Sequence, residues 1–180
     1  MKKTGDGIEA KPGSWTFSGD VVKNFDSHIK KSVPGYEEGH DLIANLASFF
    51  IGEKNSKIVE IGCSTGTLLK KIRQTTERSD VQFIGIDIEK DMIDFAKNNN
   101  QYENCSFELG NIRDYELSEC SIITSYYTIQ FINPSIRQII IDKIFNSLNW
   151  GGAFLFFEKV RGPDARFQDI TTQLYNEFKI

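Results

Sequence analysis

One stretch of the chain, residues 57–67, restricts the fold more than any other. It reads Lys-Ile-Val-Glu-Ile-Gly-Cys-Ser-Thr-Gly-Thr, a short β-branched run followed by a turn with two glycines. Such a run is typical of a central strand in a parallel sheet. Gly62 and Gly66 carry no Cβ, so another molecule can approach the backbone closely. The helix predicted next has unpaired N–H groups that point back at the turn. This order predicts a nucleoside-binding corner of an open α/β sheet.

The composition favours one globular domain that binds a small molecule. The chain has 180 residues, of which 39% are hydrophobic and 26% charged, which are ordinary values for one domain. Its net charge of −4 provides no basic field, so we expect no direct contact with nucleic acid. We find no apolar run of membrane-spanning length, no signal peptide and no metal-ligand spacing among the three cysteines. We therefore expect a cytoplasmic protein with reduced thiols, no metal and no membrane contact.

Helical and strand patterns alternate along the rest of the chain. Residues 1–18 show no period and are expected to form a flexible N-terminal arm, and residues 19–180 a single domain. Helices are expected at 20–31, 36–51, 66–76, 89–98, 134–148 and 163–178, and strands at 57–61, 81–87, 105–109, 121–126 and 153–158. The alternation predicts an α/β fold, with N-terminal helices before a doubly wound parallel sheet of about five strands.

The residues just past each strand are the candidates for binding, because a ligand of such a sheet lies outside the carboxyl ends of the strands. Asp87 ends the second strand, where a carboxylate accepts two hydrogen bonds from a ribose diol. Asn111 follows the third strand, where an amide oxygen could accept from an adenine amino group. Tyr126 and Tyr127 end the fourth strand.

Each of these residues also has an ordinary structural interpretation. Asp87 precedes a helix and suits a helix cap, Asn111 suits a tight turn, and the two tyrosines suit packing at a rim. Taken singly, each is explained better by structure than by binding, but their common position favours a ligand site. We find no convincing nucleophile–base pair, because His28 and His40 both lie on the predicted N-terminal helices. The catalytic residues therefore stay unassigned.

The spacing of the glycine turn separates two classes of nucleotide. A nicotinamide site has the fingerprint G-x-G-x-x-G, whereas three residues separate Gly62 from Gly66 and no third glycine is in place. Glu60 lies two positions before the first glycine. The turn is therefore similar to the E/D-x-G-x-G-x-G turn of class I S-adenosylmethionine-dependent methyltransferases, with Ser64 in the place of the middle glycine.

Six segments resemble the carboxy-S-adenosyl-L-methionine synthase family. They are 32–36 (Ser-Val-Pro-Gly-Tyr), 61–66, 110–114, 127–131, 142–145 and 157–159, and the first two are distinctive for the family. The resemblance runs from about residue 25 to residue 178 and implies a Rossmann-like class I methyltransferase fold. It implies a role in tRNA wobble-uridine modification. It also implies a reaction in which the sulfonium methyl group of S-adenosylmethionine loses a proton and captures carbon dioxide released from prephenate.

The resemblance further implies the contacts to S-adenosylmethionine or its carboxylated form. Asp87 would hold the ribose diol, with the amino-acid end on one side of it and the adenine on the other. The predicted contacts are Tyr36, Gly62, Cys63 and Ser64 near the amino-acid end, Asp87, Ile88, Asn111 and Ile112 toward the adenine, and Tyr126 near the ligand. Two positions depart from the family, which typically has Asp at position 111 and Asn at position 126.

The C-terminal part is shorter than the resemblance leads us to expect. The family anchors the extra carboxylate with an arginine beyond the last helix, and the class I sheet closes with an antiparallel hairpin that we do not expect here. The strand at 153–158 would then lie at an edge, where its apolar sequence favours pairing with another chain. Either the chain is a truncation or it forms a homodimer through this edge. Three interpretations stay open: a synthase of this family, a methyltransferase of a small molecule, and a truncated nucleoside-binding domain without activity.

Overall fold

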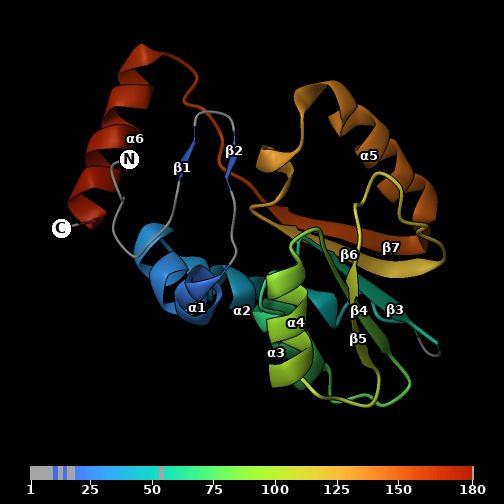
Figure 1. Cartoon of the computed structure of the whole chain (residues 1–180). Helices are drawn as coiled ribbons and strands as arrows, with labels where there is room; N and C mark the ends of the chain where they lie inside the picture. Colours follow the sequence, from blue (N-terminus) through green and yellow to red (C-terminus); the bar gives the residue numbers. More distant parts are fainter. Residues whose placement is uncertain (1–9, 12–13, 16–18, 53–54, 180) are drawn as a thin grey trace.

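A five-stranded parallel sheet forms the centre of the computed structural model, which describes residues 10–11, 14–15, 19–52 and 55–179 (Figure 1). The strand order is β5-β4-β3-β6-β7, and every neighbouring pair runs parallel. The strands are β3 (Lys57–Ile61), β4 (Gln82–Asp87), β5 (Cys105–Leu109), β6 (Cys120–Tyr126) and β7 (Leu148–Phe157). This topology confirms the predicted Rossmann-like α/β fold.

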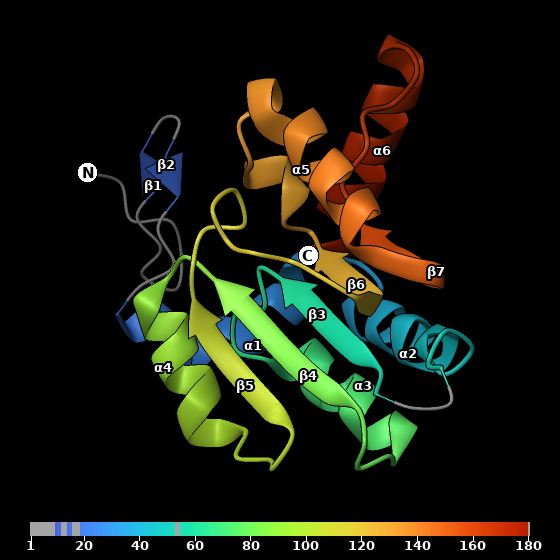
Figure 2. The ribbon, with the colours of Figure 1, turned by 90° about the vertical axis from the view of Figure 1, so that its right-hand side faces the viewer.

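The helices cover the two faces of the sheet unequally (Figure 2). Helices α2, α3 and α4 pack on one face and build the larger core, and α5 packs on the other. The helices are α1 (Asp20–Ser32), α2 (Tyr36–Ala47), α3 (Thr67–Thr76), α4 (Lys90–Asn99), α5 (Pro134–Ser147) and α6 (Ala165–Phe178).

The central strands are apolar on both sides because each side faces a core. Successive side chains of a strand point to opposite faces. In β3, Ile58 therefore packs in the core beneath α2 and α3, whereas Val59 packs in the core beneath α5, and neither is more than 1% exposed. This double burial explains the continuous β-branched run from which the strand was predicted.

The largest difference from the predicted elements lies at β7. We expected residues 149–152 to end the preceding helix and a strand to follow at 153–158, but β7 begins at Leu148. Its pairing with β6 jumps from Cys120–Leu148 to Ile122–Ala153, so the intervening residues form a bulge. Gly151 in this bulge has φ of +80°, which glycine adopts without strain.

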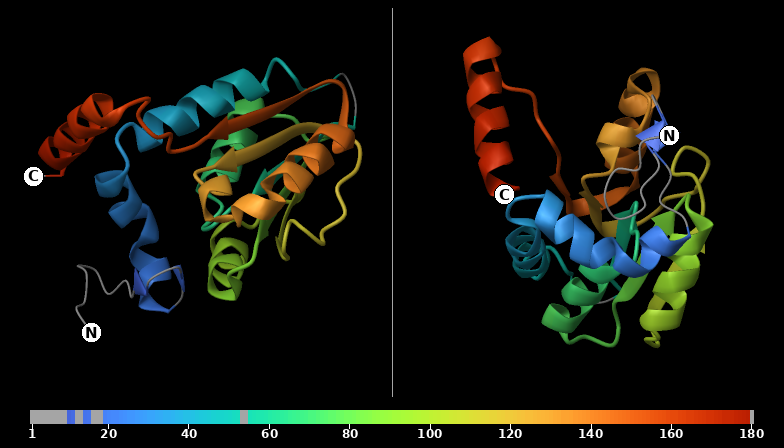
Figure 3. Two further views of the ribbon diagram at one scale, coloured as in Figure 1. Left: turned by 90° about the horizontal axis from the view of Figure 1, so that it is seen from above. Right: turned by 60° about the vertical axis from the view of Figure 1, so that its left-hand side comes forward.

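The N-terminal arm predicted for residues 1–18 lies mostly outside the described residues. Within it, β1 (Ala10–Lys11) pairs antiparallel with β2 (Ser14–Trp15). At the other end of the chain, α6 lies apart from the sheet (Figure 3). It meets the end of α1 through a hydrogen bond of 3.0 Å from the Tyr175 hydroxyl to the Ser32 carbonyl. Among the described residues no helix is long and apolar enough to cross a membrane.

The order of the strands fixes the position of the site. The chain moves from β3 to one side of the sheet through β4 and β5, and then returns to place β6 and β7 on the other side. The gap at the carboxyl ends of β3 and β6 is the switch point at which such sheets bind ligands. Helix α1 is tied to the glycine turn there, since Asp26 accepts hydrogen bonds from Thr65 Oγ1 at 2.7 Å and Thr67 Oγ1 at 3.1 Å.

Candidate functional site

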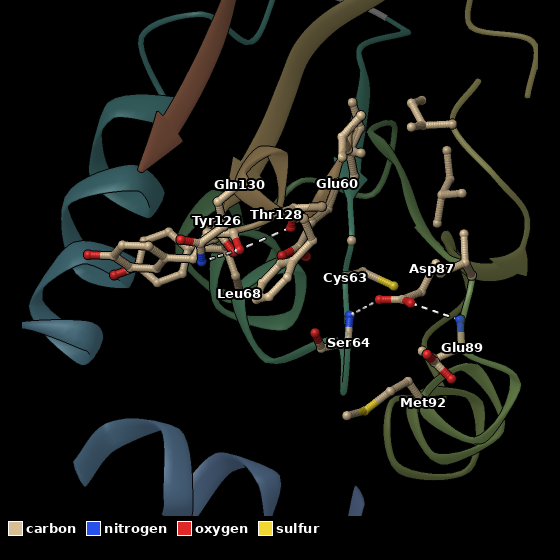
Figure 4. Close-up of a pocket in the computed structure, with 18 of the residues that line it drawn as sticks. Glu60, Cys63, Ser64, Leu68, Asp87, Glu89, Met92, Tyr126, Thr128 and Gln130 are labelled. Atoms are coloured by element: carbon tan, nitrogen blue, oxygen red, sulfur yellow. Dashed lines mark hydrogen bonds between the residues drawn. The ribbon is translucent and has the colours of Figure 1, made fainter. Parts of the chain in front are cut away.

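A pocket of about 520 Å³ lies at the carboxyl ends of β3, β4 and β6 (Figure 4). This volume is within the range of small-molecule sites. All nine residues predicted from the sequence line it: Tyr36, Gly62, Cys63, Ser64, Asp87, Ile88, Asn111, Ile112 and Tyr126. The fold therefore brings the predicted set together, and their contacts to a ligand stay a prediction.

The glycine turn is held by its own N–H groups. Those of Gly62 and Cys63 donate to the Ile86 carbonyl at 2.8 and 3.0 Å, and that of Ser64 donates to Asp87 Oδ2 at 2.8 Å. Because these donors already have partners, the turn would meet a ligand through its carbonyl oxygens and carbon atoms. Such acceptors suit the ammonium group of an amino acid.

The lack of a side chain at Gly62 has a reason that the sequence did not indicate. Its φ is +71°, and a Cβ there would lie 2.3 Å from Oγ1 of Thr128. The close approach of a ligand to this glycine stays a prediction. A side chain of the protein, that of Thr128, already requires the absence of a Cβ here.

Asp87 ends β4 beneath the turn and is 9% exposed. Its Oδ1 accepts from the Glu89 N–H at 2.9 Å, and its Oδ2 accepts from the Ser64 N–H (Figure 4). Burial raises the pKa of this carboxyl group, and the backbone N–H groups of Glu89, Ser64 and Ile88 oppose that shift. Each oxygen keeps a further lone pair, so Asp87 can stabilise the turn and still accept from a ribose hydroxyl.

Glu60 lies deeper, on β3, and is 2% exposed. Its Oε2 accepts from the Leu69 N–H at 3.0 Å in the first turn of α3, so this acid satisfies a donor at the start of the helix. Burial raises its pKa well above the ordinary value. Among the described residues that line the pocket, the acidic side chains are those of Glu60, Asp87 and Glu89, and none is lysine or arginine.

The adenine end of the predicted site is formed by residues after β4 and β5. Ile88 is 65% exposed, and Ile112 is 7% exposed and packs in the core under α5. Asn111 Oδ1 accepts from the Arg113 N–H at 3.0 Å, which is the turn role that the sequence left open. A second lone pair on this oxygen leaves an acceptor for an amino group beside two apolar side chains.

An aromatic cluster forms the opposite end of the pocket. It consists of Tyr36 and His40 of α2 and of Tyr126 and Tyr127 at the end of β6. The ring centroid of Tyr126 lies 5.1 Å from that of Tyr36, 4.6 Å from that of His40 and 4.9 Å from that of Tyr127. The Tyr126 hydroxyl donates to the Tyr36 carbonyl at 2.8 Å.

Two buried groups near the turn carry no charge at neutral pH. His40 is 3% exposed, its Nε2 has no hydrogen-bond partner, and burial lowers its pKa to about 4. Cys63 is 3% exposed and belongs to the larger core, and burial raises its pKa well above the ordinary value. Its thiol is therefore not an activated nucleophile.

Several lining residues were not singled out from the sequence. Phe25 and Ile29 reach the pocket from α1, and Gln130 reaches it from a short 3₁₀ helix (Ile129–Phe131). The carboxylate of Glu158 holds this short helix by accepting from the N–H groups of its first two residues, at 2.6 and 3.2 Å. The apolar spacing of α1 was readable, but the sequence has no signal that this helix crosses the strand ends.

Comparisons with known proteins place this site in a family. Residues 52–175 match a family model described as "Methyltransferase domain". The carboxy-S-adenosyl-L-methionine synthase of Staphylococcus epidermidis is 36% identical over 170 residues, which cover 94% of this chain and 74% of that protein. The synthase of Campylobacter lari is 34% identical over 178 residues, which cover 97% and 75%. The chain belongs to the carboxy-S-adenosyl-L-methionine synthase family.

As a member of the carboxy-S-adenosyl-L-methionine synthase family, the chain is an S-adenosylmethionine-binding transferase. A solved structure described as an S-adenosyl-L-methionine-dependent methyltransferase from Methanococcus maripaludis matches it with a TM-score of 0.64 and 18% identity, over 91% of this chain and 74% of that one. That likeness shows the fold. The pocket fits the nucleoside, since it offers a carboxylate for a ribose, an amide oxygen beside apolar side chains, and backbone carbonyls for an ammonium group.

Proposed function

We propose that the chain converts S-adenosylmethionine to carboxy-S-adenosylmethionine with carbon dioxide released from prephenate. One observation carries this proposal beyond generic methyl transfer. The turn at 32–36, which is distinctive for the family, lies far from the glycine turn in the sequence, yet Tyr36 and Gly62 line the same pocket. The two distinctive segments thus build one site.

The chain's own residues would hold the nucleoside by its two ends. Asp87 would accept from the ribose hydroxyls, and Asn111 from the adenine amino group. The carbonyl oxygens of the glycine turn would accept from the ammonium group, beside Tyr36. S-adenosylmethionine supplies a methyl group that the adjacent sulfonium charge acidifies. Prephenate would lose carbon dioxide and its hydroxyl group to become phenylpyruvate, the methyl proton would leave with that hydroxyl group as water, and the methyl carbon would bond to the carbon dioxide. The protein's part is to fix that methyl group against its partner and to exclude water, because alignment alone lowers such a barrier by several kcal/mol, about 7 or more in favourable cases.

A second candidate is methyl transfer from S-adenosylmethionine to a small molecule. It is favoured by the charge of the pocket, whose described lining includes no lysine or arginine to bind prephenate, an anion, or an added carboxylate. In methyl transfer no such cation is required.

Incubation of the purified chain with S-adenosylmethionine and prephenate separates the two candidates. Liquid chromatography with mass spectrometry should detect carboxy-S-adenosylmethionine and phenylpyruvate in equal amounts. Binding of S-adenosylmethionine in calorimetry without either product would contradict the synthase and leave methyl transfer. If the chain binds neither S-adenosylmethionine nor carboxy-S-adenosylmethionine, the third interpretation is left, a domain without activity.

We further infer that the product serves tRNA wobble-uridine modification in the cytoplasm, and that the chain self-associates through β7. The position of β7 at the sheet edge supports self-association, as does the exposure of Trp150 and Phe156 on it. Sedimentation should show a dimer that Phe156→Lys weakens. A monomer at all concentrations would exclude this interface.

A further inference from the structure

We propose that Tyr126, seated against Gly39, recognises the positive charge of the ligand's sulfonium group. This inference rests on the proposed binding of S-adenosylmethionine in the pocket, and it specifies how the pocket prefers the cationic sulfonium over the neutral thioether that remains when the methyl group is lost. It concerns binding, so it holds or fails separately from the reaction that the site performs.

The position of the Tyr126 ring depends on one glycine. A Cβ on Gly39 would lie 2.1 Å from the Tyr126 hydroxyl oxygen, 3.0 Å from Cζ and 3.2 Å from Cε2. The first distance is impossible for two non-bonded atoms, whereas the other two require only small shifts. Gly39 lies inside α2, where glycine costs about 1 kcal/mol relative to alanine. Helix α2 therefore has a residue of low helix propensity at the position where a side chain would collide with the Tyr126 ring.

The hydroxyl of Tyr126 has a partner within the protein, since it donates to the Tyr36 carbonyl. The ring itself is edge-on to the rings of Tyr36, His40 and Tyr127 and tilted against the ring of Phe157. What Tyr126 offers the pocket is therefore aromatic carbon rather than its hydroxyl group. Aromatic faces attract cations, and an attraction of this kind is stronger where water is excluded. Tyr126 is 8% exposed, so its ring is largely desolvated.

The position of the positive charge on S-adenosylmethionine is set by its covalent structure. The sulfur joins the ribose to the amino-acid chain. A ligand with its ribose at Asp87 and its amino-acid end at Tyr36 has its sulfur between these two residues, in the pocket that Tyr126 also lines.

The charged side chains that line the pocket also favour a cationic ligand group over a neutral one. Asp87 and Glu89 bring carboxylates to the pocket, whereas Glu60 is not counted because burial raises its pKa well above the ordinary value, and the described lining contains no lysine or arginine. His40, the remaining titratable ring of the cluster that could become cationic, is buried with an unpartnered Nε2. A positive sulfonium thus meets aromatic carbon and negative charge, and the thioether gains neither attraction.

The test compares dissociation constants of S-adenosylmethionine and S-adenosylhomocysteine, measured by titration calorimetry on the full chain. The wild-type protein should bind the sulfonium at least about fivefold more tightly. Tyr126→Leu should remove most of this preference. Tyr126→Phe, which keeps the ring and loses only the hydroxyl, should retain it within about twofold.

A rescue experiment tests the link to Gly39. Gly39→Ala should displace the ring and lower the preference as Tyr126→Leu does. Combining Gly39→Ala with Tyr126→Phe removes the 2.1 Å contact and should restore most of the preference. Thermal melts confirm that each variant is folded.

Three outcomes overturn the inference: no preference in the wild-type protein, an unchanged preference in folded Tyr126→Leu, or no rescue of Gly39→Ala by Tyr126→Phe. A folded Tyr126→Leu with unchanged preference would show that the ring serves packing alone. Failure of the proposed reaction is seen separately, as sulfonium-selective binding without carboxylated product.

Discussion

Protonation of His40 should control the acid stability of the fold. This side chain is 3% exposed inside the aromatic cluster, and burial lowers its pKa from 6.5 to about 4. Each unit of pKa difference between the folded and unfolded states corresponds to about 1.4 kcal/mol, so this single group accounts for about 3 kcal/mol. Lys71 lowers the pKa further, whereas Asp41 and Glu37 partly oppose the shift.

The direction of the effect follows from proton binding. Because the folded pKa is depressed, the unfolded chain binds more protons between about pH 6.5 and pH 4, and the folded state loses stability as the pH falls through that window. Urea unfolding at several pH values measures the change in the free energy of unfolding. His40→Leu should remove about 3 kcal/mol of the pH dependence between pH 6.5 and pH 4.

The matched control is His28→Leu, because it replaces the only other histidine of the chain and leaves His40 in place. This variant should keep the steep loss of stability at acid pH. If His40→Leu and the wild-type protein lose the same free energy between pH 6.5 and pH 4, burial of a neutral His40 is not the cause and the reasoning is refuted.

Two further substitutions test the glycine turn and its carboxylate. Asp87→Ala should weaken binding of S-adenosylmethionine at least tenfold, about 1.4 kcal/mol, and unchanged affinity in calorimetry would refute the ribose assignment. The same substitution should lower the free energy of unfolding by about 2–4 kcal/mol, because two N–H groups lose their acceptor. Gly62→Ala should destabilise the fold by about 1–3 kcal/mol in urea unfolding through its contact with Thr128, and Thr128→Gly should recover part of that loss. If Thr128→Gly gives no recovery, the backbone conformation alone requires the glycine.

Local sequence patterns were sufficient for most of the fold. The β-branched runs predicted the strands because both faces of a central parallel strand are buried, and β5 has the predicted bounds. The predicted start of β7 was five residues too late. The bulge there depends on pairing with Cys120, a partner that no local pattern specifies.

The candidate site was predictable where strand ends and a glycine turn define it. Asp87 and the turn could be located because position in a doubly wound sheet sets what lies at the switch point. The reasons for particular residues were less accessible. The sequence does not show what the absence of a side chain at Gly39 and Gly62 accommodates within the fold, because the side chains that would meet a Cβ there are distant in sequence. The sequence assigned no role to His40, which is a buried neutral ring in the structure.

Carboxylation of the methyl group of S-adenosylmethionine in this pocket is the reaction that we propose. The most direct test supplies the purified chain with S-adenosylmethionine and with prephenate that carries an isotope label in the carboxyl group it loses. Mass spectrometry of the nucleoside should then show a carboxylated product that contains the label. A nucleoside that stays unlabelled and uncarboxylated, in a protein shown by calorimetry to bind S-adenosylmethionine, would contradict the proposal.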